Sequence, residues 1–415
     1  MTRPTTRLDC EALDRADPLA AMRDAFHLPE GVVYLDGNSL GPLPKATAAR
    51  VREVVEEEWG VGLIRSWNDA GWFDKPRTLG DRLASLIGAG PGEVVVCDST
   101  SVNLFKVVVA AARLRPGRSV VVSDRDNFPT DLYMIEGATG LLEGFDRRLT
   151  SPDGPSLAEV LDEDVALVVL THVDYRTGHM HDLTAVTEQV QRAGALMVWD
   201  LAHSAGAVPV DLNGAGADFA VGCTYKYLNG GPGSPAFVFA ATRHQDQVSQ
   251  PLSGWHGHAR PFAFVPAYEA AEGISRFLCG TPPLLSYAGL EASLGMWAGV
   301  DLATVREKSL ALTSLFMDLV EQECAEWGVE VVTPREPDLR GSQVSLRHQE
   351  GYAVIQALIE RGVIGDFRAP DLMRFGFTPL YLGYADVWDA VAALREVLNS
   401  EEWRAERFHR RAAVT

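Results

Sequence analysis

Short apolar runs alternate with helical patterns between residues 93 and 240. Each run is rich in valine or other strand-forming residues; the runs are residues 93–99, 119–125, 164–173, 195–200, 218–225 and 234–240. Segments with helical spacing, such as 102–115 and 182–194, lie between them. Continuous apolar runs suit strands covered on both faces, and intervening helices indicate parallel neighbours. We therefore predict an α/β fold built on a large, mostly parallel sheet.

The pattern changes after about Asp301. Apolar residues recur at helical spacing from Leu312 to Val320. Beyond them the sequence predicts strands at 329–332, 342–346 and near 372–377, and helices at 352–362 and 385–398. This order predicts a smaller α+β domain, ferredoxin-like in outline. The predicted parts are an N-terminal segment (1–45) that packs with the small domain, a large domain (46–300) and a small C-terminal domain (301–415).

Length and charge narrow the class of protein. A chain of 415 residues exceeds what one hydrophobic core usually supports. Its 37 basic and 56 acidic residues leave a formal net charge of -19, which repels phosphate backbones and anionic lipid surfaces. We therefore expect neither a nucleic-acid nor a membrane partner.

The five cysteines are scattered and form no CxxC pair, which indicates reduced thiols and no zinc site. The N-terminus lacks the apolar core of a signal peptide, and no run approaches the roughly 20 apolar residues that span a bilayer. The histidines at 172, 179, 181, 256 and 258 lack the acidic or thiol companions of a metal site. We expect a cytoplasmic protein without a metal ion.

Polar residues end several of the predicted strands, and the carboxyl ends of parallel strands meet at one edge of a sheet. Asp200 closes one run, and Lys226 follows at the end of the next. A buried lysine and a buried carboxylate are each costly without a partner. Pyridoxal phosphate satisfies both, because it binds a lysine covalently and its ring nitrogen favours an acidic neighbour. Either residue alone also fits a surface lysine or an ordinary turn aspartate.

The phosphate of such a cofactor needs hydroxyl and N–H donors. Thr100 and Ser101 stand where a strand passes into a helix, where hydroxyls cap the helix and free amides attract an anion. Simple capping is the alternative. Phe128, near Asp131, could offer an aromatic face to the cofactor ring, or it could only pack a loop.

Nine motifs in consistent order span nearly the whole chain: YLDGNSLGPLP (34–44), STSVNLFK (99–106), NFPTDLYM (127–134), THVDYRTGHMHDL (171–183), VWDLAHSAGAVPVDL (198–212), CTYKYLNGGPGSPAFVF (223–239), LSGWHGH (252–258), FLCGTPPLLS (277–286) and RFGFTPLY (374–381). Together they resemble kynureninase, a fold-type I pyridoxal phosphate enzyme related to the class V aminotransferases. Thr281 is similar to the bacterial, kynurenine-preferring type.

The resemblance implies a role for each matching residue. Lys226 would bind the cofactor, Asp200 would face its ring nitrogen and Phe128 would stack on its ring. The residues implied to contact or line the cofactor are Thr100, Ser101 and Tyr225 on the phosphate side, with Asp131, Thr171 and His203 around it. Trp255 and Thr281 would reach the phosphate of the neighbouring subunit, so a homodimer with shared sites is implied. Arg374 would bind the substrate carboxylate, which suits a planar guanidinium better than a lysine.

The implied reaction is hydrolytic cleavage of L-kynurenine, or of a ring-substituted kynurenine, to anthranilate and L-alanine. Lys226 would also serve as the base, Tyr225 would pass a proton, and the glycines after Lys226 would let the backbone approach the cofactor. A class V aminotransferase would use the same Lys226, Asp200 and Arg374. A cysteine desulfurase would need a reactive cysteine on a late mobile loop, and residues 325–415 contain none. A protein that binds partners without catalysis is a further alternative. Trp67, Asn68 and Trp72 are candidates for the wall of the substrate pocket, which spacing alone does not assign.

Overall fold

The computed structural model describes residues 4–411 and divides into two compact units, each of which is described by itself. Unit 1 comprises Met1–Ala46, Tyr175–Met180 and Met296–Thr415, and unit 2 comprises Thr47–Asp174 and His181–Gly295. No pattern in the sequence indicates that the short segment Tyr175–Met180 belongs with unit 1. Helix α2 (Lys45–Glu53) and helix α10 (Leu284–Trp297) each run across a boundary between the units.

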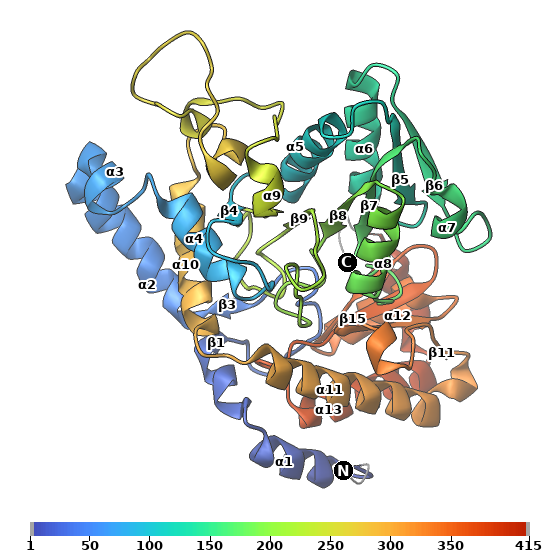
Figure 1. Cartoon of the computed structure of the whole chain (residues 1–415). Coiled ribbons are helices and arrows are strands. Elements are labelled where there is room, and N and C mark those ends of the chain that lie inside the picture. The colour runs from blue at the N-terminus through green and yellow to red at the C-terminus, as the bar shows by residue number, and fades with distance from the viewer. Residues whose placement is uncertain (1–3, 412–415) are drawn as a thin grey trace. The chain divides into compact units, whose positions relative to one another are not determined.

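Within the described residues, unit 2 is built on a seven-stranded sheet of order β4-β10-β9-β8-β7-β5-β6. Its strands are β4 (Val94–Val96), β5 (Val120–Asp124), β6 (Asp146–Thr150), β7 (Val165–Thr171), β8 (Leu196–Asp200), β9 (Phe219–Gly222) and β10 (Phe237–Ala240). The central pairs are parallel, whereas β10 is antiparallel to both β9 and β4. All six predicted strands are present, and the mostly parallel sheet is confirmed (Figure 1).

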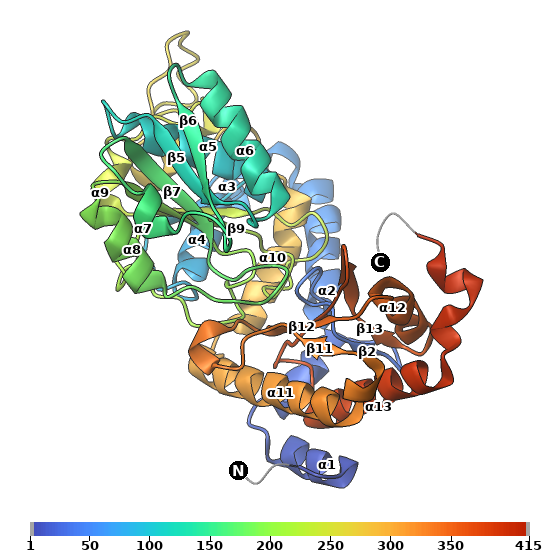
Figure 2. The same cartoon turned by 90° about the vertical axis from the view of Figure 1, so that its right-hand side faces the viewer.

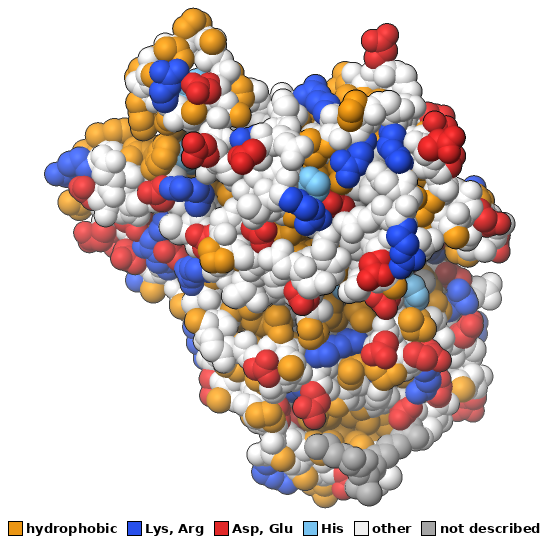
Figure 3. All heavy atoms as spheres, viewed as in Figure 1, with side chains coloured by type: hydrophobic (Ala, Val, Ile, Leu, Met, Phe, Trp, Pro, Cys, Tyr) orange, Lys and Arg blue, Asp and Glu red, His pale blue; other side chains and the backbone are white. Residues whose placement is uncertain are grey.

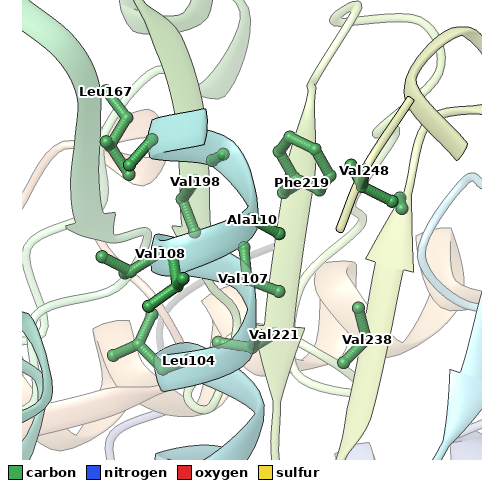
Figure 4. Close-up of a cluster of buried hydrophobic side chains, with 14 of the residues drawn as sticks. Leu104, Val107, Val108, Ala110, Leu167, Val198, Phe219, Val221, Val238 and Val248 are labelled. Carbon is green, nitrogen blue, oxygen red and sulfur yellow. The ribbon is translucent and has the colours of Figure 1, made fainter. Parts of the chain in front are cut away.

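Helix α5 (Thr100–Arg113) packs its apolar side on this sheet. Its residues Leu104, Val107 and Val108 are fully buried, and in Figure 4 they face valine, leucine and phenylalanine side chains of the strands. Other helices of unit 2 include α6 (Pro129–Leu141), α7 (Leu157–Val160) and α8 (Leu183–Arg192). All three are labelled in Figures 1 and 2. These strands are buried on both faces, which explains why apolar residues follow one another along them and do not alternate with polar residues.

The remaining elements of unit 2 are short. They are the π-helix η2 (Val54–Gly62), η3 (Leu63–Arg65), α3 (Ser66–Asp69), α4 (Lys75–Ala84), α9 (Thr242–Gln245), η4 (Trp255–Gly257) and η5 (Gly273–Phe277). A long irregular segment joins η4 to η5 and exposes several apolar side chains. Phe264 is 86% exposed and Phe262 is 66% exposed.

Unit 1 contains an antiparallel sheet of order β11-β12-β15-β14. Its strands are β11 (Glu330–Val331), β12 (Gln343–Arg347), β14 (Asp366–Arg368) and β15 (Leu372–Gly376). Its helices are α1 (Arg7–Ala16), α11 (Leu302–Glu323), α12 (Gly351–Glu360) and α13 (Tyr384–Ser400). The predicted ferredoxin-like outline is wrong, because β11 and β12 follow each other as an antiparallel pair with no α-helix between them.

The N-terminal segment of unit 1 is held by backbone and ionic contacts. Strand β2 (Val33–Tyr34) pairs in parallel with β13 (Val363–Ile364), and β1 (Phe26–His27) pairs with β3 (Leu43–Pro44). Arg7 of α1 forms an ion pair with Asp389 of α13 at 2.7 Å. The 3-10 turns η1 (Ala20–Ala25), η6 (Ala325–Trp327), η7 (Pro337–Leu339), η8 (Glu402–Arg404) and η9 (Glu406–His409) complete the unit. Among the described residues, no helix is both long and apolar enough to cross a membrane.

Candidate active site

Six strands of unit 2 end at the same edge of the sheet. Because β4 and β9 are both antiparallel to β10, β4 runs in the direction of the parallel strands β5, β6, β7, β8 and β9. Nine of the predicted site residues lie at or just beyond the carboxyl ends of these strands: Thr100, Ser101, Phe128, Asp131, Thr171, Asp200, His203, Tyr225 and Lys226. This is the edge at which open α/β sheets bind ligands.

Two carboxylates are buried together at this edge. Thr171 and Asp200 are the last residues of neighbouring strands and lie opposite each other, and Asp131 lies in the first turn of α6. Burial, reinforced by the charge of Asp200, raises the pKa of Asp131 well above its usual value. Burial also raises the pKa of Asp200, although the Ala202 N–H, which donates to it at 2.8 Å, and Lys226 oppose this rise. The pair therefore favours a further positive partner.

Lys226 follows β9 in a tight turn. Its Nζ lies 2.9 Å from His203 Nε2, and the side chain is half-buried. The turn closes on itself, because the Gly230 N–H donates to the Thr224 carbonyl at 2.8 Å. A Cβ at Gly230 would lie 2.4 Å from Ser234 Oγ, and Gly231 has a φ of +91°. Glycine is therefore needed at position 230 because the turn packs closely against its own residues.

Tyr225 precedes Lys226 and is also half-buried. The neighbouring Cys223 thiol, together with burial, raises the pKa of the Tyr225 hydroxyl, so that it stays protonated at neutral pH. It can therefore donate a hydrogen bond at neutral pH, although the raised pKa makes it a weaker acid than a free tyrosine.

The predicted capping role of Thr100 and Ser101 is wrong in detail. Ser99 is the N-cap of α5, since it has an extended backbone (φ -104°, ψ 163°) and its side chain accepts from the Val102 N–H at 3.4 Å. Thr100 and Ser101 are the first helical residues, so their amides belong to the group that has no partner within the helix. That arrangement still favours an anion.

Trp255 and Thr281 lie elsewhere in unit 2, in the segment between β10 and α10. Trp255 packs in an aromatic group, with its ring centroid 5.6 Å from that of Trp67 and 4.9 Å from that of His256. Trp67 also contacts Trp72, whose indole N–H donates to Glu58 at 2.6 Å. Thr281 is exposed.

Arg374 lies in the middle of β15 in unit 1 and is 1% exposed. Its Nε donates to Asp366 at 2.8 Å, and its Nη2 also donates to that carboxylate. Its Nη1 donates to the Tyr175 carbonyl at 2.8 Å, and its Nη2 to Ser39 Oγ at 2.7 Å. All three guanidinium nitrogens thus bond to the protein, and a substrate carboxylate would have to share or replace the contacts of Nη1 with Tyr175 and of Nη2 with Ser39.

Asp366 also accepts from Arg368 at 2.7 Å. Burial alone would raise the pKa of Asp366, but Arg374 and Arg368 outweigh it, and the pKa lies below its usual value. Asp36 lies in the same group, and burial together with the charge of Asp366 raises the pKa of Asp36 to about 7. Unit 1 therefore contains one firmly ionised carboxylate beside one that titrates near neutrality.

Comparison with known proteins adds an independent line of support. The profile of the kynureninase C-terminal domain matches residues 305–394. Kynureninase from Burkholderia pseudomallei strain K96243 is 59% identical over 99% of this chain and 100% of its own length, and the Pseudomonas fluorescens protein is 58% identical over the same shares. The chain belongs to the kynureninase family. The resemblance drawn from its motifs is confirmed.

Solved structures confirm the fold. The apo cysteine desulfurase from Thermococcus onnurineus NA1 has a TM-score of 0.77 at 20% identity and covers 91% of this chain and 98% of its own. The cystine C-S lyase C-DES, in complex with cysteine persulfide, has a TM-score of 0.78 at 17% identity and covers 88% and 98%. These similarities show that the kynureninase family member has the fold-type I architecture that was predicted.

Several residues of these sites were not predicted from the sequence. Asn127 binds the Thr171 hydroxyl and donates to Ser123 Oγ at 3.1 Å. Asp366 and Ser39 hold Arg374, and a search for the carboxylate that any buried arginine requires would have found Asp366 in the same hairpin. Among residues 4–411, no group of acidic, histidine and cysteine side chains could hold a metal ion.

Proposed function

We propose that Lys226 carries the cofactor covalently at the sheet edge of unit 2 and that Arg374 of unit 1 binds the substrate α-carboxylate. The observation that carries this proposal is the buried pair Asp131–Asp200 beside Lys226, in a chain of the kynureninase family. Both carboxyl groups have raised pKa values, so a positively charged ring nitrogen would relieve an unfavourable burial. The residues present therefore fit pyridoxal 5'-phosphate.

Family membership defines the reaction. The chain is a hydrolase that acts on a carbon–carbon bond in a ketonic substrate, cleaving kynurenine to anthranilate and L-alanine, a reaction of tryptophan catabolism and of NAD biosynthesis. Pyridoxal 5'-phosphate is its cofactor and, when bound, supplies an electron sink for the α-carbon of the substrate. Which kynurenine it prefers, unsubstituted or 3-hydroxylated, depends on one small group worth about 1–3 kcal/mol in a pocket.

The chain's own residues would move the protons. Released from the cofactor, Lys226 Nζ would take the α-proton, and His203 at 2.9 Å would orient it. Asp200 would keep the cofactor ring nitrogen protonated. Water would then add to the γ-carbonyl, the Cβ–Cγ bond would break, and the Tyr225 hydroxyl, protonated at neutral pH, would pass a proton toward the alanine product.

The phosphate would bind at the start of α5. Thr100 and Ser101 are the first residues of α5, where free amides and partial positive charge favour an anion. Phe128, 40% exposed at the start of α6, would stack on the ring, and Thr171 would line the cofactor.

We also propose a homodimer in which Trp255 and Thr281 complete the phosphate site of the partner subunit. The segment between η4 and η5 supports this, because Phe262, Phe264 and Val265 are exposed there. Figure 3 shows hydrophobic side chains gathered on the projecting loop that Figure 1 colours yellow. An apolar surface of this kind is typical of an interface. The five free cysteines, four of them buried, are typical of a cytoplasmic protein.

The test is to add L-kynurenine to the purified protein and measure anthranilate by fluorescence and alanine by amino-acid analysis. Equal amounts of the two products support the proposal, with 3-hydroxykynurenine tested in parallel. A class V aminotransferase would instead consume a keto acid and release no anthranilate. That result would overturn the proposed function.

A further inference from the structure

A second lysine, which is buried, lies on α5, the helix at whose start the phosphate is proposed to bind. Lys106, on α5, has no exposed surface. Its Nζ donates to Asp98 Oδ2 at 2.7 Å and to the Phe277 carbonyl at 2.7 Å, and it lies 3.4 Å from Cys97 Sγ. None of the steps given to Lys226 uses this group.

Lys106 and its helix neighbour Asn103 hold the loop that joins β4 to α5. Asn103 Nδ2 donates to the Cys97 carbonyl at 2.7 Å. Asp98 has a φ of +48°, in the left-handed region that a non-glycine residue adopts only at a cost. Contacts from Asn103 and Lys106 therefore fix the conformation of the residues directly before Ser99, the N-cap of α5.

The Phe277 carbonyl connects a second segment to the same ammonium. Phe277 is buried at the end of η5, and the chain from there leads through Cys279 to the exposed Thr281. A single buried charge thus holds both the loop before Thr100 and the segment before Thr281.

Burying an ammonium costs free energy that an apolar side chain of similar size would not cost. Lys106 instead contacts loop backbone and the carboxylate of Asp98, whose backbone is strained. A rigid loop at this position would keep ligand-binding groups in place. We propose that Lys106 is a positioning residue for the cofactor phosphate, because it holds the Cys97–Ser99 loop and the 277–281 segment in their binding conformations. This inference rests on the proposed phosphate site at Thr100 and Ser101.

The chain offers a matched control. Lys308 on α11 of unit 1 is also buried, and its Nζ binds one carboxylate, Asp17, at 2.6 Å and one carbonyl, Pro379, at 2.6 Å. Lys106→Met and Lys308→Met therefore remove the same kind of buried ion pair, but only the first lies beside the proposed phosphate site. Asp98→Asn, in which the carboxylate is replaced and Lys106 is kept, serves as a second variant if Lys106→Met does not fold.

The experiment measures dissociation constants of the apo-proteins for pyridoxal 5'-phosphate and for pyridoxal, which lacks the phosphate, alongside thermal unfolding. Supporting groups around a bound ligand are worth about 10- to 100-fold in affinity at metal sites, and a similar loss is expected here. Lys106→Met, or Asp98→Asn in its place, should weaken binding of the phosphorylated form about tenfold or more and leave pyridoxal within about twofold. Lys308→Met should lower the unfolding temperature and leave the ratio of the two constants unchanged.

An unchanged ratio in Lys106→Met, or in Asp98→Asn if the former does not fold, would overturn the inference. Equal loss of both ligands would also overturn it, because that result means general destabilisation. If the wild-type protein itself does not discriminate between the two ligands, the proposed phosphate site fails first, and the role given to Lys106 fails with it. The wild-type measurement thus separates the two failures.

Discussion

Each unit buries a group of charged side chains, but the charges are balanced differently. In unit 1, Asp366 is bound by Arg374 and Arg368, and its pKa is lowered. In unit 2, Asp131 and Asp200 lie beside Lys226, and the pKa of each carboxyl is raised by burial. In the first group Asp366 is satisfied by the fold itself, although the pKa of Asp36 beside it is raised to about 7. The second has an excess of carboxylates over the ammonium beside them.

This difference separates a recognition site from a reaction site. Arg374 is held by hydrogen bonds to Asp366, Tyr175 and Ser39, and a planar guanidinium fixed in this way suits binding of a carboxylate without chemistry. In unit 2, burial disfavours the charged form of both carboxyl groups, and a cationic ring would stabilise that form. Perturbed pKa values of this kind are common at reactive sites.

The largest effect is expected for Lys226→Ala. Loss of the covalent attachment and of the base should lower kcat/KM by about 1,000-fold or more and abolish the visible absorbance of the bound cofactor. Lys45→Ala, which removes an exposed lysine at the start of α2, is the control and should behave as the wild type. A coloured and active Lys226→Ala protein would contradict the assignment.

The next effect is expected for Asp200→Asn. Without this carboxylate the ring nitrogen loses the partner that keeps it protonated, so kcat should fall by about 100-fold or more. Asp131→Asn should cost less, because Asp131 acts through its neighbour, and the double variant should be less impaired than the product of the two single effects. Steady-state kinetics of the three variants give the comparison, and simple multiplicative losses would mean that the two carboxylates act independently.

A smaller effect is expected for Arg374→Lys. A lysine keeps the charge but loses parallel hydrogen bonds worth about 1.5–3 kcal/mol, so KM should rise about 10- to 100-fold with a smaller change in kcat. Arg368→Lys is the control, because that arginine also binds Asp366 but is one-third exposed. If the two variants raise KM equally, Arg374 has no special role in binding the substrate.

The smallest effect concerns stability and pH. A carboxyl whose pKa is raised in the folded state holds its proton more tightly there than in the unfolded chain, so stability falls as pH rises from the usual value of 3.8 through the raised pKa. As pH rises above the usual carboxyl value of 3.8, the apo-protein should lose more stability than the cofactor-bound protein, because a cationic ring lowers those pKa values.

Urea unfolding at several pH values measures this difference. Asp36, with its pKa of about 7, contributes a loss of the same sign in both forms, so it cancels in the comparison, and Asp36→Asn should flatten both curves equally. Identical pH slopes for the apo and loaded wild-type proteins would mean that the cofactor does not meet the Asp131–Asp200 pair.

Much of the fold could be predicted because buried parallel strands have unmistakable sequences. The run 164–173 became β7 with every residue buried, and Asp200 and Thr171 ended neighbouring strands as such runs imply. The segment Tyr175–Met180 could not be placed, because its contacts lie with unit 1, far along the chain, as in the hydrogen bond from the Gly341 N–H to the Gly178 carbonyl.

Supporting residues were harder to predict than the residues that they support. Lys106 lies in a run of valines and alanines, where sequence alone shows an interruption of an apolar helix face and not a contact to Phe277, 171 residues away. The same holds for Ser39 and Arg374, which are 335 residues apart. Such pairs depend on tertiary structure that no local pattern encodes.

The most direct test of the central claim is to locate the cofactor on the chain. The sequence contains five lysines, at positions 45, 75, 106, 226 and 308. The loaded protein would be reduced with borohydride, digested and mapped by mass spectrometry. The account predicts one pyridoxyl phosphate group per chain, on Lys226. A modification on any other lysine, or none in an active preparation, would contradict it.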